Sequence, residues 1–260
     1  MSKELTTNAT GTDLLKYEDT GVGFEDVGSD DMILPFIKVA QALTPEVEEQ
    51  LCKSGDLINT VSGEIYPGEE GFVFQPCHIQ TLFVEWEPRA AGGAMVGKYE
   101  PHDETVQAAI ADNAGSDFGK LSVGDNDLVK TMYVYGLMLD ETGLEVDGFA
   151  ILSFSQTKLK IVKRWITAMS MLRGKPSIYR NRAVITTQKE KNDFGTFYNF
   201  KIGPFDTSPL KSLLSPEEHG ATIQAGADFR AMVLTGAAQA QDTTAASGPM
   251  PTDTDDEIPF

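Results

Sequence analysis

The sequence contains few of the residues from which metal sites, disulfide frameworks and membrane spans are built. Cys52 and Cys77 are its only cysteines, which excludes a disulfide framework or a cysteine-based zinc site. The three histidines, His78, His102 and His219, are too far apart for metal-ligand spacing. No apolar run approaches the roughly 18 residues of a membrane span, and the N-terminal stretch MSKELTTNATG lacks the apolar region of a signal peptide. We therefore expect a soluble, cytoplasmic protein that uses no metal, no cofactor and no membrane.

Basic side chains are also scarce, and they are unevenly distributed. The chain has 39 acidic residues against 21 Lys and Arg, a net charge of −18. Residues 150–201 nevertheless hold 11 of the basic and only 2 of the acidic residues, a net +9, whereas residues 1–31, 32–149 and 202–260 carry −6, −14 and −7. An acidic surface repels phosphate, so the whole chain cannot act as a general nucleic-acid coat. The basic segment is either a local anion site or a solvated face that balances neighbouring acids.

The chain divides into a central domain with two polar ends. Residues 1–31 are acidic and glycine-rich and predict a disordered leader, residues 32–235 predict one folded domain, and residues 236–260 predict a disordered acidic tail. Within the domain, residues 32–47 predict a strand or short helix, and residues 56–66 predict two short strands around a Ser62-Gly63 turn.

The order of the longer elements predicts a small β-barrel. Strand patterns cover residues 71–87, interrupted at Pro76, and then 131–139, 146–154, 179–189 and 195–202. Apolar residues at helical spacing after Ser155 predict one amphipathic helix, which ends at Gly174-Lys175-Pro176. Five strands with a helix between the third and fourth is the element order of the OB fold, so we expect an OB-like five-stranded barrel that is mainly β. Residues 88–130 would be a long strand 1–2 loop, and residues 210–234 a C-terminal helical segment broken at Gly220.

The basic segment combines the two groups that single-stranded nucleic acid requires, namely cations for the phosphates and aromatic rings for the bases. Period-2 alternation predicts that Arg180 and Arg182 share one strand face, and that Phe197, Asn199 and Lys201 share one face of the next strand. Tyr198, Phe200 and Ile202 would then point into the barrel. The residues that we expect to contact nucleic acid are Lys158, Lys163, Arg164, Arg180, Arg182, Lys189, Lys191, Phe197 and Lys201.

Each of these residues also has a purely structural interpretation. The lysines of the helix are equally compatible with a helix face that is simply solvated, and Phe197 is equally compatible with edge-strand packing. Trp165 is expected to be a half-buried packing residue rather than a stacking platform, because an aromatic residue at helical spacing usually serves the core.

The C-terminus combines acidic residues with an apolar end. A partner pocket could hold a terminal aromatic ring and its carboxylate while the acids face a basic rim. The residues expected to dock a partner are Asp255, Asp256, Glu257, Ile258, Pro259 and Phe260. This ending resembles the acidic D-D-D-I-P-F tip of bacterial single-stranded DNA-binding proteins, although Glu257 stands where Asp is usual.

The leader, the stretches GDLINTVSGEI and VEWEPR, and the long chain are more similar to a bacteriophage-encoded single-stranded DNA-binding protein. The resemblance implies a protein of the host bacterial cytoplasm that protects single-stranded DNA during phage replication, recombination and repair. It also implies that the tip recruits replication and recombination proteins.

Two other classes of function remain open. Acidic pairs such as Asp125/Asp127 or Glu85/Glu87 could hold Mg²⁺ in a nuclease, but no Walker loop, nucleophile elbow or glycine fingerprint is present, so we expect no enzyme. A charge of −18 is also compatible with a regulator that binds a basic protein, for example host RNA polymerase.

Overall fold

The structure is a computed structural model, which describes residues 33–113, 121–192 and 195–236. Its strands are β1 (Phe36–Val39), β2 (Leu57–Asn59), β3 (Ile65–Tyr66), β4 (Phe72–Trp86), β5 (Met95–Tyr99), β6 (Leu121–Val123), β7 (Asn126–Leu139), β8 (Val146–Ser155), β9 (Ala183–Asn192) and β10 (Gly195–Pro204). Its α-helices are α1 (Pro45–Glu48), α2 (Glu104–Asp112), α3 (Leu159–Ser170) and α4 (Gly220–Leu234). Among the helices of these residues, none is both long and apolar enough to cross a lipid bilayer.

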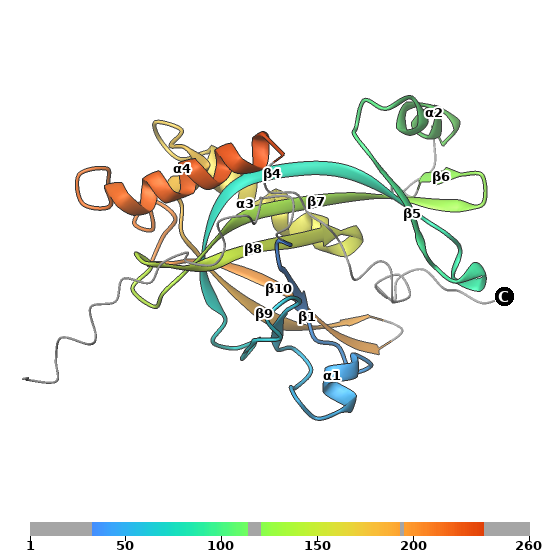
Figure 1. Cartoon of the computed structure of the whole chain (residues 1–260), viewed down its shortest axis with the longest axis horizontal. Helices are drawn as coiled ribbons and strands as arrows, with labels where there is room; N and C mark the ends of the chain where they lie inside the picture. The colour runs from blue at the N-terminus through green and yellow to red at the C-terminus, as the bar shows by residue number, and fades with distance from the viewer. Residues whose placement is uncertain (1–32, 114–120, 193–194, 237–260) are drawn as a thin grey trace, which may run out of the picture.

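All ten strands belong to one sheet, which curls into an open half-barrel (Figure 1). The main path runs β10-β9-β4-β7-β8-β1-β2-β3, with β5 added to β4 and β6 added to β7. The pairs are antiparallel except β1 with β8, where Phe36 pairs with Ile151 in parallel. The two longest strands, β4 and β7, pair along almost their whole length and form the spine of the molecule.

The structure confirms a mainly β protein but not a five-stranded barrel. The five predicted strands correspond to β4, β7, β8, β9 and β10, and the predicted helix is α3, between β8 and β9. The register of β4 against β7 shifts between Pro76 and His78, so the proline that interrupts the strand pattern lies at a bulge. Residues 57–66 form the predicted hairpin.

Residues 88–130 are not the long loop that the sequence predicted. They contain β5, α2 and β6, which pack on the far ends of β4 and β7 as a small lobe (Figure 1). A separate hydrophobic cluster of Phe83, Val106, Ala109, Leu121 and Leu128 holds this lobe together. Its elements are short, so their periodicity is too weak to recognise in the sequence.

Apolar side chains fill both sides of the sheet. Inside the curl, side chains from β1, β2, β4, β7, β8, β9 and β10 meet α3. On the outer side, α4 covers β4, β7 and β8 through Phe229, whose ring stacks on Phe149 at 4.9 Å. The fully buried Gln75 secures α4, because its Nε2 donates to the carbonyls of Tyr179 (2.5 Å) and Thr222 (3.0 Å).

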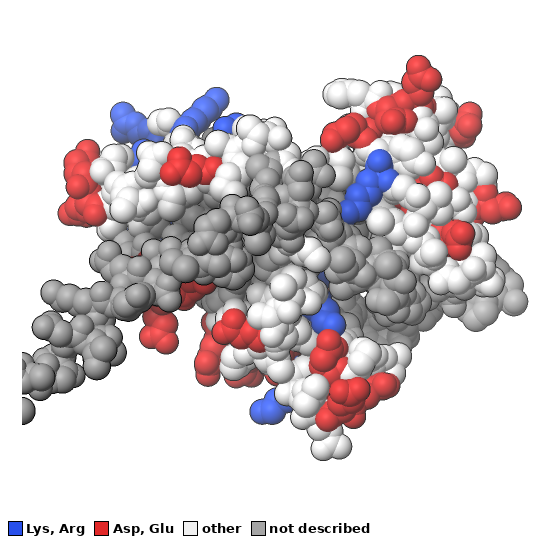
Figure 2. Space-filling view, viewed as in Figure 1, with Lys and Arg blue, Asp and Glu red and all other residues white. Residues whose placement is uncertain are grey.

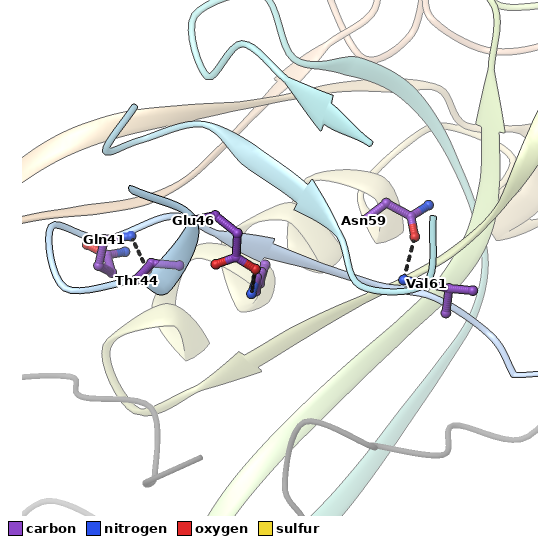
Figure 3. A network of polar contacts seen from close by, with 6 residues as sticks. Gln41, Thr44, Glu46, Asn59 and Val61 are labelled. Atoms are coloured by element: carbon purple, nitrogen blue, oxygen red, sulfur yellow. Dashed lines mark hydrogen bonds and ion pairs between the residues drawn. The ribbon is translucent and has the colours of Figure 1, made fainter. Parts of the chain in front are cut away.

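One glutamine side chain joins the two ends of the curl. The Nε2 of Gln41 donates to the carbonyl of Tyr198 (2.8 Å), and the backbone N–H of Tyr198 donates to its Oε1 (2.9 Å). The amide group therefore pairs with β10 as a neighbouring strand would. Thr44 and the Lys38–Glu46 ion pair (2.6 Å) hold the segment that carries Gln41 (Figure 3).

The β7–β8 turn predicts a measurable dependence of stability on acid. The hydroxyl of Thr142 and the backbone N–H groups of Leu144 and Glu145 donate to Asp140, which lowers the pKa of Asp140 from 3.8 to about 2. A lowered carboxylate pKa stabilises the folded state above pH 3.8, and this stabilisation is lost as the pH falls toward 2. In urea denaturation, Asp140→Asn should therefore unfold more easily than the wild type at pH 7 but not at pH 2. Glu141→Gln, in the same turn, is the control. If the wild type and Asp140→Asn differed in free energy of unfolding as much at pH 2 as at pH 7, the stabilising role of the Asp140 carboxylate would be contradicted.

Candidate nucleic-acid interface

The helix α3 presents its basic residues to solvent because its apolar residues are held by the core. Val162 and Met169 are buried, and Trp165 and Ile166 are half-buried against the inner cluster, so the expected packing role of Trp165 is confirmed. The opposite side of the helix carries the exposed residues Lys160, Lys163 and Arg164, and Lys158 lies half-buried just before the helix.

The β9–β10 hairpin places two more lysines on the same side of the molecule as α3. In its register Lys189 faces Tyr198 and Lys191 faces Thr196. Because alternate residues of a strand share a face, these side chains lie on the face that carries Phe200. Phe200 is buried in the inner cluster, to which α3 also contributes, and α3 contacts β10 directly. The cations of α3 and of the hairpin therefore border one region, which we name the α3–hairpin surface. It consists of Lys158, Lys160, Lys163, Arg164, Lys189, Lys191 and Tyr198.

Acidic partners are absent from this surface. Over residues 33–113, 121–192 and 195–236, the one ion pair is Lys38–Glu46, so none of the cations of the α3–hairpin surface is paired with a described carboxylate. Glu190 lies between the two hairpin lysines in sequence, but it faces Phe197 on the opposite side of the hairpin. The acidic side chains gather elsewhere, including on the lobe and around α1 (Figure 2). Because these cations are not paired with described carboxylates, they favour an anion site over a face that merely balances neighbouring acids.

Arg180 and Arg182 do not form the outward strand face that the sequence predicted. Arg180 lies in a 3-10 turn (Ile178–Arg180), and its Nε and Nη2 donate to the carbonyl of Leu214 at 3.1 and 3.0 Å. Arg182 begins the next segment but is buried, at 9% exposure. Its Nε donates to the carbonyl of Ser212 and its Nη1 to that of Gly143, both at 3.2 Å. Period-2 alternation fails here because the strand begins only at Ala183.

The guanidinium of Arg182 also lies 4.4 Å from the ring centroid of Phe205. It thus connects the β7–β8 turn, the start of β9 and the segment that leads to α4. Burial lowers the pKa of Arg182, yet a guanidinium stays charged at any physiological pH. We conclude that both arginines support the fold from positions where backbone carbonyls occupy their donors.

Phe197 and Lys201 lie on the other face of the hairpin from the lysine pair. Phe197 faces Glu190 and is half-buried, while Lys201 faces Thr186 and is exposed. Asn199, expected on the same outward strip, is fully buried. Phe200 and Ile202 point inward as predicted. The nine predicted contact residues are therefore divided among three environments rather than forming one strip.

Two residues of the α3–hairpin surface were not among the predicted contacts. Lys160 is exposed beside Lys163, and the sequence offered no reason to prefer one over the other. Tyr198 was expected inside the barrel, but its ring is half-buried against Gly55, where a β-carbon would lie 2.6 Å from it. The positive φ of Gly55 (+100°) and this close approach both require glycine. Only the hairpin register reveals that this ring shares a face with Lys189.

The carboxylate pairs considered for a magnesium site have other roles or surroundings. Glu85 is buried, and it accepts hydrogen bonds from the hydroxyl of Tyr99 and the Nδ2 of Asn126, both at 2.6 Å. It therefore holds the lobe together, and its hydrogen bond raises the pKa of Tyr99. No group of three or more His, Cys, Asp or Glu suited to a metal ion occurs within the part of the chain that the structure describes. The predicted docking residues Asp255 to Phe260 lie outside that part.

Comparison with known proteins places the chain in one family. No curated protein and no solved structure matches it. A family model described as "Pam3 phage gp34-like protein" matches residues 5–236, which is most of the chain and includes every described element. The protein, with its half-barrel and its α3–hairpin surface, therefore belongs to the Pam3 phage gp34-like family.

Proposed function

We propose that this protein binds single-stranded DNA through the α3–hairpin surface during phage replication, recombination or repair. One observation carries the proposal. In a chain of net charge −18, six cations from α3 and the β9–β10 hairpin border one region without any described carboxylate partner. Exposed cations of this kind attract a polyanion, and a backbone with flexible, unpaired bases can follow a surface that joins a helix to a hairpin.

The arrangement of strands supports the proposal. The order β10-β9-β4-β7-β8, with α3 between β8 and β9 in the chain, is compatible with the strand order of an OB-like barrel that has been opened. In that fold the loops after strands 1 and 4 commonly contact oligonucleotides. Their counterparts are the lobe and the tip of the β9–β10 hairpin. Fold likeness alone does not define function, so the cations remain the stronger support.

The direct test is a titration of fluorescein-labelled oligo-dT with the full chain, followed by anisotropy at several salt concentrations. Intrinsic tryptophan fluorescence is a poor readout, because Trp86 is buried and Trp165 packs on the core. We expect saturable binding whose affinity falls steeply with salt, and weaker binding of a duplex with the same sequence. An oligonucleotide that does not bind at 20–50 mM salt, roughly the range in which phosphate contacts are strongest, would refute the function.

The acidic tail adds a second role to the proposal. By its resemblance to the tip of bacterial single-stranded DNA-binding proteins, the segment Asp255–Phe260 would dock a replication or recombination protein. It would also compete with DNA for the cations of the α3–hairpin surface, because opposite charges on one chain attract.

Deleting residues 242–260 should therefore tighten binding of oligo-dT. The deletion removes five carboxylate side chains, and its effect should be largest at low salt, where attraction between tail and surface is least screened. Anisotropy titrations at two salt concentrations measure the effect. A chain of full length in which those five acids are replaced by Asn or Gln is the control and should behave as the deletion does. Equal affinities at low salt would count against the competition.

A further inference from the structure

A pocket lined by none of the residues of the α3–hairpin surface has the chemistry of a site for a cation. It has a volume of about 490 Å³ and lies between the β2–β3 hairpin and the start of β8. Two carboxylates, Glu64 and Asp147, are among its lining residues, together with the rings of Tyr66 and Phe149. The two segments that contribute most of the lining, residues 54–70 and 131–149, contain no Lys or Arg. The pocket therefore has no basic side chain from these segments to neutralise its acids.

A buried side chain that lines the pocket has donors available to a ligand. Asn59 is only 8% exposed, and its Oδ1 accepts the backbone N–H groups of Val61 and Ser62 at 3.0 and 3.1 Å. This turn fixes the amide group so that its Nδ2 points away from Val61 (Figure 3). The hydrogen bonds that the Asn59 side chain makes with described residues are those accepted by its Oδ1, and its Nδ2 is not a buried atom without a partner. Because this N–H group reaches solvent where Asn59 lines the pocket, it is available to donate to a carbonyl or carboxylate oxygen of a ligand.

The rings and acids favour the remaining part of the same ligand. The hydroxyl of Tyr66 donates to Oε2 of Glu64 at 2.6 Å, and burial followed by this bond raises the pKa of Tyr66, so the hydroxyl stays neutral. Phe149 is supported from behind by its stack on Phe229 and is itself 41% exposed. An aromatic face beside two carboxylates suits a guanidinium or ammonium group.

A neighbouring strand edge suggests a peptide rather than a free amine. β3 ends the sheet, so its outer edge is not covered by another strand of the described sheet. Ile65, the first of its two residues, is exposed, and Tyr66, the second, lines the pocket. An extended peptide could pair with this edge, give a backbone carbonyl to Asn59 and insert one side chain between the carboxylates.

From these features we infer that the pocket binds the Arg or Lys side chain of an extended, basic segment of a partner protein. This site is separate from the α3–hairpin surface and does not depend on DNA binding. It recognises positive charge, whereas the α3–hairpin surface recognises negative charge.

The test uses the full chain and the peptide Ac-Thr-Val-Arg-Val-Thr-NH₂, with citrulline in place of Arg as the neutral control. Citrulline keeps the shape and loses the charge. We expect the Arg peptide to shift the side-chain ¹H–¹⁵N signals of Asn59 saturably and to bind at least about tenfold more tightly than the citrulline peptide. The double variant Glu64→Gln/Asp147→Asn should lose that preference. The double variant Glu141→Gln/Glu145→Gln removes the same charge from the adjacent exposed turn and should keep it.

Three outcomes would overturn the inference. The Asn59 signals could stay unmoved at millimolar peptide, or both peptides could bind equally. Alternatively, butylguanidinium could bind as tightly as the Arg peptide, which would show that the pocket takes a free organic cation. None of these binding measurements involves DNA, so their results are independent of the oligo-dT titration.

Discussion

Replacing Lys163, Arg164, Lys189 and Lys191 together by glutamine should nearly abolish binding of single-stranded DNA at moderate salt. Each phosphate contact on a single strand contributes about 0.7 to the slope of log Kobs against log[salt], so losing four contacts lowers that slope by about 2.8. The corresponding loss of affinity is about 10³–10⁴-fold at 50 mM salt and about 10²-fold at 200 mM. Anisotropy of labelled oligo-dT across this range measures both quantities.

A matched variant separates this surface from net charge. Lys53, Lys201, Lys211 and Arg230 are exposed and are not part of the α3–hairpin surface, and replacing them by glutamine also removes four positive charges. If the α3–hairpin surface is the site, this control should retain affinity within a few-fold, through loss of long-range attraction alone. Equal losses of affinity for oligo-dT in the two variants would show that the α3–hairpin surface is not the DNA-binding site.

The second large effect is expected at Arg182 and concerns stability rather than DNA. Arg182→Ala removes a buried side chain, its two hydrogen bonds to the carbonyls of Ser212 and Gly143, and its stack on Phe205. Leaving such buried acceptors without donors should lower the free energy of unfolding by about 3 kcal/mol. Urea denaturation measures the loss, and the folded variant should bind oligo-dT with an unchanged salt slope.

Arg164→Ala is the reciprocal control. Arg164 is exposed on α3, so its loss should change the free energy of unfolding by less than about 0.5 kcal/mol while weakening oligo-dT binding. Replacing Arg182 should thus lower stability and leave the affinity for DNA unchanged, whereas replacing Arg164 should lower the affinity and leave stability nearly unchanged. If the Arg182→Ala protein were stable and its binding of oligo-dT depended less on salt, Arg182 would contact DNA as the sequence predicted. That result would contradict the assignment of DNA binding to the α3–hairpin surface.

Long elements with clear periodicity were predictable from the sequence. The helix α3 and the five strands β4, β7, β8, β9 and β10 have strong apolar patterns, and the bulge at Pro76 follows from its missing N–H group. Short elements were missed, since β5, β6 and α2 have too few residues for a periodic pattern to emerge. The parallel pairing of β1 with β8 was beyond reach because it joins segments more than 100 residues apart.

The candidate interface shows the same division. Charge segregation follows directly from the composition, and it located the basic segment without any structure. The exposure of Lys163 and the burial of Arg182 do not follow from it, since both are cations within the same segment. Alternation correctly placed Tyr198 on the same face as Phe200, but it could not show that the ring lies half-buried against Gly55 and beside Lys189, because that depends on strand pairing.

The order of residues thus accounts for which segments are helical, which are extended and where positive charge is concentrated, because these properties depend on neighbours along the chain. Which cations face solvent, which ring lies beside Lys189 and which donors of Asn59 are available to a ligand depend on strand register and on contacts between distant segments. Such contacts form only when the sheet curls. The basic surface and the acidic pocket can therefore be recognised only in the folded structure.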